Sequence, residues 1–309
     1  MIKSELDIEN ELKEQNIYSR GNKHVATLRC LYDKTYTFGT ICGIHGHAGW
    51  WNDVSLRVFA DLAPEFGFNF YVIDGRELAI DRVSRKSPTD VKFRGHKLAL
   101  GRSVQAIKAL YKSRGKNFRD GYNIAVGHSM GCRAWSDLGL ESSTIRGLFA
   151  EYTFVNPYVL TSRRILDLIE RSPDPSSFLN RSGNKPKSRK IDNVEFSYKI
   201  NSANFNIPLI GNTDARDIPA VANLVSGYLN NKNQNDIILN FILGTADKEA
   251  DWKQNKELFE KLPFTENKNK FIHEVAGGNH HMDNVVDLYR PVVKQVLGAA
   301  QRRAIARKR

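Results

Sequence analysis

The stretch that decides the fold is residues 122–131, which read Tyr-Asn-Ile-Ala-Val-Gly-His-Ser-Met-Gly. It is an apolar run that ends in the pattern G-x-S-x-G, and from Cys132 the sequence is compatible with a helix. A strand that turns sharply into a helix leaves little room two positions to either side of the turn, and Gly127 and Gly131 supply that room. Ser129 would then stand above the edge of a sheet. The stretch therefore predicts a nucleophilic serine.

A pattern of five residues also occurs by chance in loops that contain glycine and serine. The interpretation of Ser129 therefore depends on whether the partners of such a serine follow in the right places. These partners are expected at the ends of the other predicted strands, because the sites of parallel sheets lie at the carboxyl ends of the strands.

Composition indicates a globular chain. The 309 residues are 41% hydrophobic and 10% aromatic, which suits one large α/β domain with an insertion, or two domains. We expect no membrane span and no signal peptide, because no run of about 20 apolar residues is present and residues 1–15 are charged throughout. Cys30, Cys42 and Cys132 lie in or beside apolar segments. We interpret them as buried thiols of a cytoplasmic protein, not as disulfides or metal ligands.

The net charge of +12 raises the question of a polyanionic partner. The basic residues gather in two clusters, Lys185, Lys187, Arg189 and Lys190, and Arg302, Arg303, Arg307, Lys308 and Arg309. Neither cluster has the interleaved aromatic residues of a single-strand binding surface or a recognisable nucleic-acid module. We interpret them as a solvated loop and a helical tail, with no specific nucleic acid as partner, and a polyanion contact stays as the alternative.

Apolar strands alternate with helices along most of the chain. The expected strands are 24–32, 37–44, 69–73, 121–126, 147–155, 236–243 and 270–275, and the expected helices are 61–66 and 98–111. Residues 77–95 are polar and are expected to form a loop. Right-handed crossovers between such strands give a doubly wound, mostly parallel sheet. The predicted fold class is therefore α/β.

Four segments at strand ends together resemble the α/β-hydrolase family. The pattern around Ser129 resembles its nucleophile elbow, and His45-Gly-His-Ala-Gly49 resembles its oxyanion loop. Gly244-Thr-Ala-Asp247 resembles the turn that carries its acid, and Gly277-Gly-Asn-His-His281 resembles the loop that carries its histidine. The order Ser129, Asp247, His280 is the order that this fold imposes. The resemblance covers roughly residues 23–157 and 236–298.

The resemblance implies a serine hydrolase that cleaves a small carboxyl ester or thioester and needs no cofactor or metal. The backbone amides of His47 and Met130 would form its oxyanion hole. Acyl transfer, perhydrolysis or a binding protein without chemistry remain alternatives on the same scaffold. A metal site at His45 and His47 is disfavoured, because no cysteine or carboxylate cluster accompanies them.

Two assignments have rivals, and several substrate contacts are expected. We favour His280 as the base over its neighbour His281, and Asp247 as the acid over Asp251 and Asp283. The side chains expected to contact the substrate are Trp50, Trp51, His128, Asn156 and His281.

The expected division of the chain has four parts. Residues 1–20 form a leader or short helix, 21–157 and 236–300 form the hydrolase core, and 301–309 form a basic tail. Residues 158–235 leave the alternating pattern, with helices at 161–171 and 218–229 and a strand pair near 194–200. We expect them to form an inserted cap that excludes water and shapes the substrate pocket.

Overall fold

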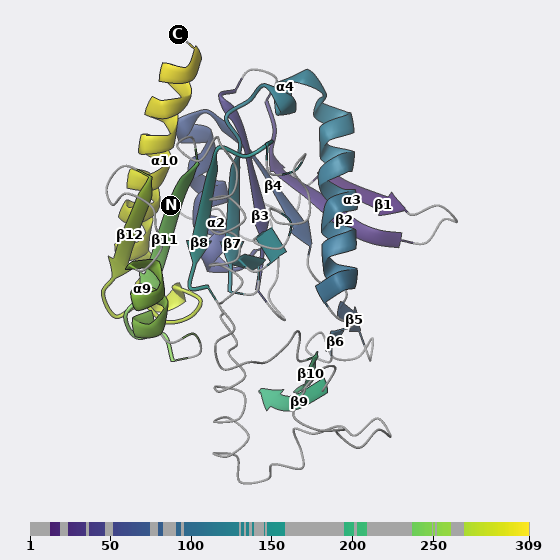
Figure 1. Cartoon of the computed structure of the whole chain (residues 1–309), viewed down its shortest axis with the longest axis vertical. Helices are drawn as coiled ribbons and strands as arrows, with labels where there is room; N and C mark the ends of the chain where they lie inside the picture. Colours follow the sequence, from purple (N-terminus) through teal and green to yellow (C-terminus); the bar gives the residue numbers. More distant parts are fainter. Residues whose placement is uncertain are drawn as a thin grey trace.

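The main element of the structure is an eight-stranded sheet with the order β1-β2-β4-β3-β7-β8-β11-β12 (Figure 1). Its strands are β1 Lys13–Tyr18, β2 His24–Tyr32, β3 Gly39–Ile44, β4 Phe68–Asp74, β7 Ile124–His128, β8 Glu151–Val155, β11 Ile238–Gly244 and β12 Lys270–Val275. This computed structural model describes residues 13–18, 24–34, 37–46, 52–74, 80–82, 91–93, 96–129, 131–132, 134–135, 138, 145, 147–157, 195–200, 203–208, 237–248, 250, 252–260 and 269–308.

The sheet is parallel from β4 to β12 and antiparallel at the edge that β1 and β2 form. Strands β3, β7, β8 and β11 are buried along their whole length, as parallel strands covered on both faces must be. The chain leaves β3 toward one edge of the sheet and leaves β7 toward the other. Ligands of open α/β sheets bind outside the carboxyl ends of strands at such a reversal. The predicted doubly wound, mostly parallel sheet is confirmed.

Helices cover both faces of the sheet and enclose two cores. Their bounds are α2 Val54–Leu62, η1 Ala63–Phe66, α3 His96–Arg114, α4 Lys116–Arg119, α9 Trp252–Glu260, η5 Asp283–Val285 and α10 Val286–Lys308. Successive residues of a strand point to opposite faces, so Ile41 packs in the core that contains α2 and α10, and Cys42 packs in the core that contains α3. All three cysteines have buried thiols. Among the described helices, none has the length and apolarity to cross a membrane.

The last helix is fixed to the sheet by a buried carboxylate. Glu151, at the start of β8, accepts hydrogen bonds from Tyr122 Oη at 2.6 Å, from Asn240 Nδ2 at 3.1 Å and from Arg303 Nη1 at 2.5 Å. Burial raises the pKa of Glu151, and the charge of Arg303 opposes that effect. The segment expected to form a basic helical tail, residues 301–309, therefore also contributes to the interior through Arg303. Residues up to Lys308 continue α10, and Arg303 has a structural partner in the interior.

Replacing Arg303 with alanine should lower the free energy of unfolding by about 3 kcal/mol, because it leaves the Glu151 carboxylate buried without its cation. This value is at the lower end of the usual cost of removing one partner of a buried ion pair. The Arg303 side chain is 28% exposed, so water can replace part of the interaction. Urea unfolding measures the change. The exposed neighbour Arg302, replaced by alanine, is the control and should change stability little. Equal unfolding midpoints for the two variants would contradict the role of Arg303.

A second, four-stranded sheet lies beyond the end of the main sheet at which β11 and β12 finish (Figure 1). Its order is β5-β6-β10-β9, with β5 Ile80–Arg82, β6 Val91–Phe93, β9 Glu195–Ile200 and β10 Ala203–Pro208. The strand pair expected near 194–200 is present as the β9–β10 hairpin. The expected loop at 77–95 is corrected, because β5 and β6 lie within it and β6 pairs with β10. The helices expected at 161–171 and 218–229 fall outside the described residues.

Two further expectations at element boundaries are corrected. Residues 13–18, assigned to a leader or short helix, form the edge strand β1, which pairs with β2. The helix expected at 61–66 begins earlier, at Val54, where the Asp53 side chain accepts from the backbone of Ser55 and caps it. Strand β7 also runs further than expected and ends at His128, directly before the predicted nucleophile.

Candidate active site

The turn after β7 has the sharp geometry that its sequence predicts. Ser129 has a backbone φ of 53°, which is a strained conformation for a residue with a side chain. Its amide donates to the carbonyl of Val155 at 3.0 Å, which helps to hold the turn. A Cβ at Gly127 would lie 2.6 Å from Cys132 N, and one at Gly131 would lie 2.0 Å from the carbonyl oxygen of Ile44. Neither position therefore has room for a side chain.

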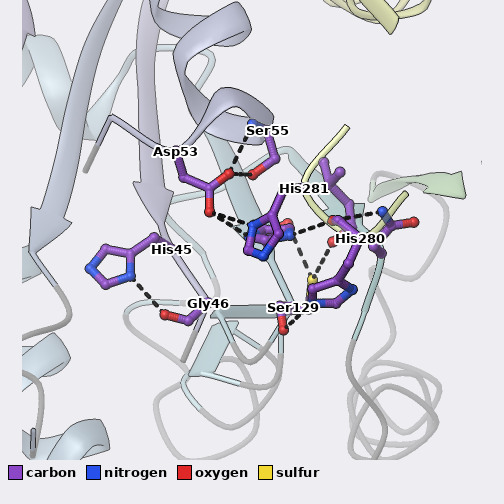
Figure 2. A network of polar contacts seen from close by, with 12 residues as sticks. His45, Gly46, Asp53, Ser55, Ser129, His280 and His281 are labelled. Carbon is purple, nitrogen blue, oxygen red and sulfur yellow. Dashed lines mark hydrogen bonds and ion pairs between the residues drawn. The ribbon is translucent and has the colours of Figure 1, made fainter. Parts of the chain in front are cut away.

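The structure brings the side chains of Ser129, His280 and Asp247 into one chain of hydrogen bonds (Figure 2 shows the serine and the histidine). His280 Nε2 lies 2.9 Å from Ser129 Oγ, and His280 Nδ1 lies 2.8 Å from Asp247 Oδ2. A carboxylate accepts from Nδ1–H, so Nε2 of the neutral ring is left to accept the serine proton. Each of the three residues is 5% exposed. A hydroxyl within reach of a base that a third group orients is the arrangement of an activated nucleophile.

The acid turn and the histidine loop pack backbone to backbone. Asp247 follows β11 in a turn, and its second carboxylate oxygen accepts from the amide of Ala250 at 2.9 Å. The amide of Ala246 donates to the carbonyl of Gly278 at 2.9 Å. A Cβ at Gly244 would lie 2.4 Å from that same carbonyl oxygen. Because the two loops touch this closely, the distance between Asp247 and His280 is set by the backbone.

Asn156 joins these loops, and its expected role is corrected. It follows β8 with a φ of 43° and is buried. Its Nδ2 donates to the carbonyls of Asn279 at 2.9 Å and His280 at 2.8 Å, and its Oδ1 accepts from the amide of Gly244 at 2.8 Å. We expected this side chain to contact substrate. Since both of its polar atoms bind backbone of the two loops, Asn156 is a positioning residue.

Replacing Asn156 with alanine should lower kcat by about 10- to 100-fold and leave KM nearly unchanged, because a small displacement of the base impairs the reaction without removing a substrate contact. Steady-state kinetics on an ester separates the two constants. Asn284→Ala is the control. It also removes two hydrogen bonds to backbone of this loop, but at an exposed position where water can replace them, so kcat should fall less. A raised KM with kcat unchanged would instead support the substrate contact that the sequence suggested.

The two adjacent histidines face different partners. The Nδ1 of His281 lies 3.0 Å from Asp53 Oδ2 (Figure 2), whereas it is His280 Nε2 that lies 2.9 Å from Ser129 Oγ. The geometry therefore favours His280 as the base. Of the two rival acids, Asp283 accepts a hydrogen bond from Asn279 at 2.6 Å, and Asp251 falls outside the described residues.

His128 is wholly enclosed between the loops. Its Nε2 donates to the carbonyl of His280 at 2.8 Å, and its Nδ1 lies 3.4 Å from Asp53 Oδ2. Burial lowers the pKa of His128 to about 4, against the opposing effect of Asp53, so the ring is neutral at pH 7. His128 is 1% exposed and its polar atoms point at protein groups. We therefore correct its expected role as a substrate contact.

Asp53 is a site residue that the sequence reasoning missed. Burial alone would raise the pKa of its carboxyl, but the electrostatic interaction with His128 and the hydrogen bond from His281 outweigh this and hold the pKa well below its usual range. The pattern Asp-x-Ser before an apolar helix is a signal for a helix cap. It gives no hint of the histidines, which come from β7 and from the loop after β12.

The expected oxyanion loop lies against the serine where the structure describes it. A Cβ at Gly46 would lie 2.7 Å from the Cβ of Ser129, so the end of β3 reaches the turn after β7. His45 is buried, and its Nδ1 donates to the carbonyl of Gly46 at 2.7 Å (Figure 2). The expected oxyanion donors His47 and Met130, and the expected substrate contacts Trp50 and Trp51, fall outside the described residues.

The chain is similar in structure to solved esterases. Est1E from Butyrivibrio proteoclasticus superposes with a TM-score of 0.58 at 14% identity, covering 93% of this chain and 98% of that one. The esterase PF2001 from Pyrococcus furiosus superposes with a TM-score of 0.57 at 13% identity, and the match covers 97% of this chain and 94% of the esterase.

An α/β serine hydrolase homologue from Coxiella burnetii superposes with a TM-score of 0.50 at 11% identity, and the match covers 92% of this chain and 97% of the homologue. No protein-family model and no curated protein sequence matches the chain. At these identities the likeness concerns the fold, and it confirms the predicted α/β-hydrolase fold class.

Proposed function

We propose that this chain, which has the α/β-hydrolase fold, is a serine hydrolase that cleaves a carboxyl ester or thioester of a small molecule. The observation that carries the proposal is the continuous hydrogen-bonded chain from Ser129 Oγ through His280 to Asp247. It lies at the reversal of strand order, where ligands of such sheets bind.

The proposed reaction proceeds through an acyl-enzyme. His280 Nε2 takes the proton of Ser129 Oγ as that oxygen attacks the acyl carbon, and the Asp247 carboxylate stabilises the imidazolium. The imidazolium then gives its proton to the leaving alcohol or thiol. A water molecule, deprotonated by the same ring, attacks the acyl-enzyme and releases the acid. No step requires a cofactor.

The negative charge of the tetrahedral intermediate needs donors beside Ser129. We propose the backbone amides of His47 and Met130 for this role, on the sequence resemblance. The close approach of Gly46 to Ser129 supports it, because the residue after Gly46 belongs to the same loop. Removing one such donor typically costs about 10²- to 10³-fold in kcat.

Labelling with a fluorophosphonate probe tests the proposal, because the probe reacts with an activated serine and requires no knowledge of the substrate. We expect wild type to be labelled and Ser129→Ala to stay unlabelled. A panel of p-nitrophenyl esters and acyl thioesters of rising chain length then defines the acyl group. Equal labelling of wild type and Ser129→Ala, or none of wild type, would refute the proposal. Product analysis with added alcohols or amines separates hydrolysis from acyl transfer.

A further inference from the structure

Three side chains beside the proposed active site converge on one point and take no part in the proposed reaction. They are Asp53, His128 and His281, and their ligand atoms all lie within 4.8 Å of one another. Asp53 Oδ2 is 3.0 Å from His281 Nδ1 and 3.4 Å from His128 Nδ1 (Figure 2 shows the contact with His281). One carboxylate and two imidazoles are a donor set that binds divalent transition metals.

The orientation of the buried histidine is the strongest evidence. The Nε2 of His128 donates to the carbonyl of His280, so Nδ1 is the ring atom that remains to bind a cation. Among the residues that the structure describes, no group makes a hydrogen bond to His128 Nδ1, although the atom is buried. Metal-bound histidines almost always donate their other ring N–H to a carbonyl or carboxylate in this way.

A shared proton does not account for the whole arrangement. A proton on His281 Nδ1 explains its 3.0 Å contact with Asp53, but it leaves His128 Nδ1 buried without a hydrogen bond to any described residue, 3.4 Å from the same carboxylate oxygen. A metal ion placed between these atoms would bind both imidazoles and the carboxylate. His128 Nδ1 is therefore in a position to bind a cation.

The Asp53 carboxylate is held in an orientation that suits a metal ligand. Asp53 Oδ1 accepts from the backbone amide of Ser55 at 3.2 Å and from its hydroxyl at 2.8 Å. These bonds leave Oδ2 directed toward the two histidines. Hydrogen bonds to the second oxygen are the usual support of a metal-bound carboxylate.

We propose that Asp53 Oδ2, His128 Nδ1 and His281 Nδ1 bind a single divalent transition-metal ion, for which Zn²⁺ is the best fit. Ligand atoms of tetrahedral zinc lie about 3.3 Å apart, as its bond lengths of about 2.0–2.2 Å require. Two imidazoles disfavour Ca²⁺ and Mg²⁺, which prefer oxygen ligands. The His281 side chain is 43% exposed, which gives the ion a route of entry and leaves room for water as a fourth ligand.

The ion would link three segments that are distant in sequence. Asp53 begins α2, His128 ends β7 immediately before Ser129, and His281 follows the proposed base. Through His281 it would fix the histidine loop to the body of the sheet. We assign it a structural role. No metal was expected from the sequence, because His45 and His47, two residues apart, have no further ligands nearby in sequence, whereas Asp53, His128 and His281 lie in three distant segments.

Metal binding is measured on the full chain without an affinity tag, freed of metal by dialysis against a chelator. After equilibration with Zn²⁺ and gel filtration, we expect one zinc per chain by elemental analysis and a Tm that rises with Zn²⁺ concentration. Asp53→Asn and His281→Ala should each weaken Zn²⁺ binding by at least about 100-fold. The asparagine keeps an oxygen for Ser55 and remains a good helix cap, so this variant is expected to fold.

Asp283→Asn is the matched control, because it removes a carboxylate from the same loop and leaves the three ligands in place. It should bind Zn²⁺ as wild type does. Failure of wild type to retain zinc would overturn the proposal, and so would equal zinc affinity in Asp53→Asn, His281→Ala and the control. Neither readout depends on catalysis, so the result is separate from that of the fluorophosphonate experiment.

Discussion

Replacing Ser129 with alanine should lower kcat by about 10⁶-fold on any ester or thioester that the wild type cleaves, because it removes the atom that forms the acyl-enzyme. Some acceleration over water should survive, since binding and the oxyanion donors do not require the hydroxyl. The measurement is steady-state turnover with the best substrate of the ester panel. His280→Ala should cost about as much, because without its base the hydroxyl is a weak nucleophile.

The thermal stability of Ser129→Ala should stay close to that of wild type. The strained φ of 53° is set by the turn and is no worse for alanine than for serine. The substitution deletes one hydrogen bond to His280, worth about 1 kcal/mol. A variant that folds and turns over normally would contradict the assignment of Ser129. If His281→Ala were inactive and His280→Ala active, the base would have been assigned to the wrong histidine.

The residues of the proposed triad could be predicted from the sequence for a physical reason. Ser129, Asp247 and His280 each lie directly or shortly after the end of a strand and beside glycine residues, so local sequence shows where each one lies. Parallel strands bring their carboxyl ends to one edge of the sheet, and the fold then places the three side chains together. The same reasoning misplaced Asn156, because sequence does not show whether an amide faces substrate or backbone.

Features that depend on distant partners were not predictable in this way. Strands β5 and β6 have three residues each, too few for a period-2 pattern, and β6 pairs with a strand more than 100 residues away. Arg303 lies in a basic run that looks the same in sequence whether its partner is water or a buried glutamate. Asp53 is likewise brought to His128 and His281 only by the fold.

Replacing Asp247 with asparagine should lower kcat by about 10⁴-fold and change KM little. The side chain keeps its shape, and an asparagine oxygen can still accept from the amide of Ala250. An NH₂ group then stands 2.8 Å from His280 Nδ1 and donates to it. That bond moves the ring proton to Nε2, which can no longer accept the proton of Ser129. Asp283→Asn, on the same loop as His280, is the control and should keep kcat near wild type.

The site contains a second carboxylate–histidine pair, so the effect of Asp247→Asn can be compared with that of the equivalent substitution in the other pair. Asp53 and His281 form a pair with nearly the same separation as Asp247 and His280, 3.0 Å against 2.8 Å. In the structure it is His280 Nε2, from the first pair, that lies 2.9 Å from the serine oxygen. Asp53→Asn should therefore reduce kcat far less than Asp247→Asn does. The reverse ranking would show that Asp53 and His281, not Asp247 and His280, activate the nucleophile.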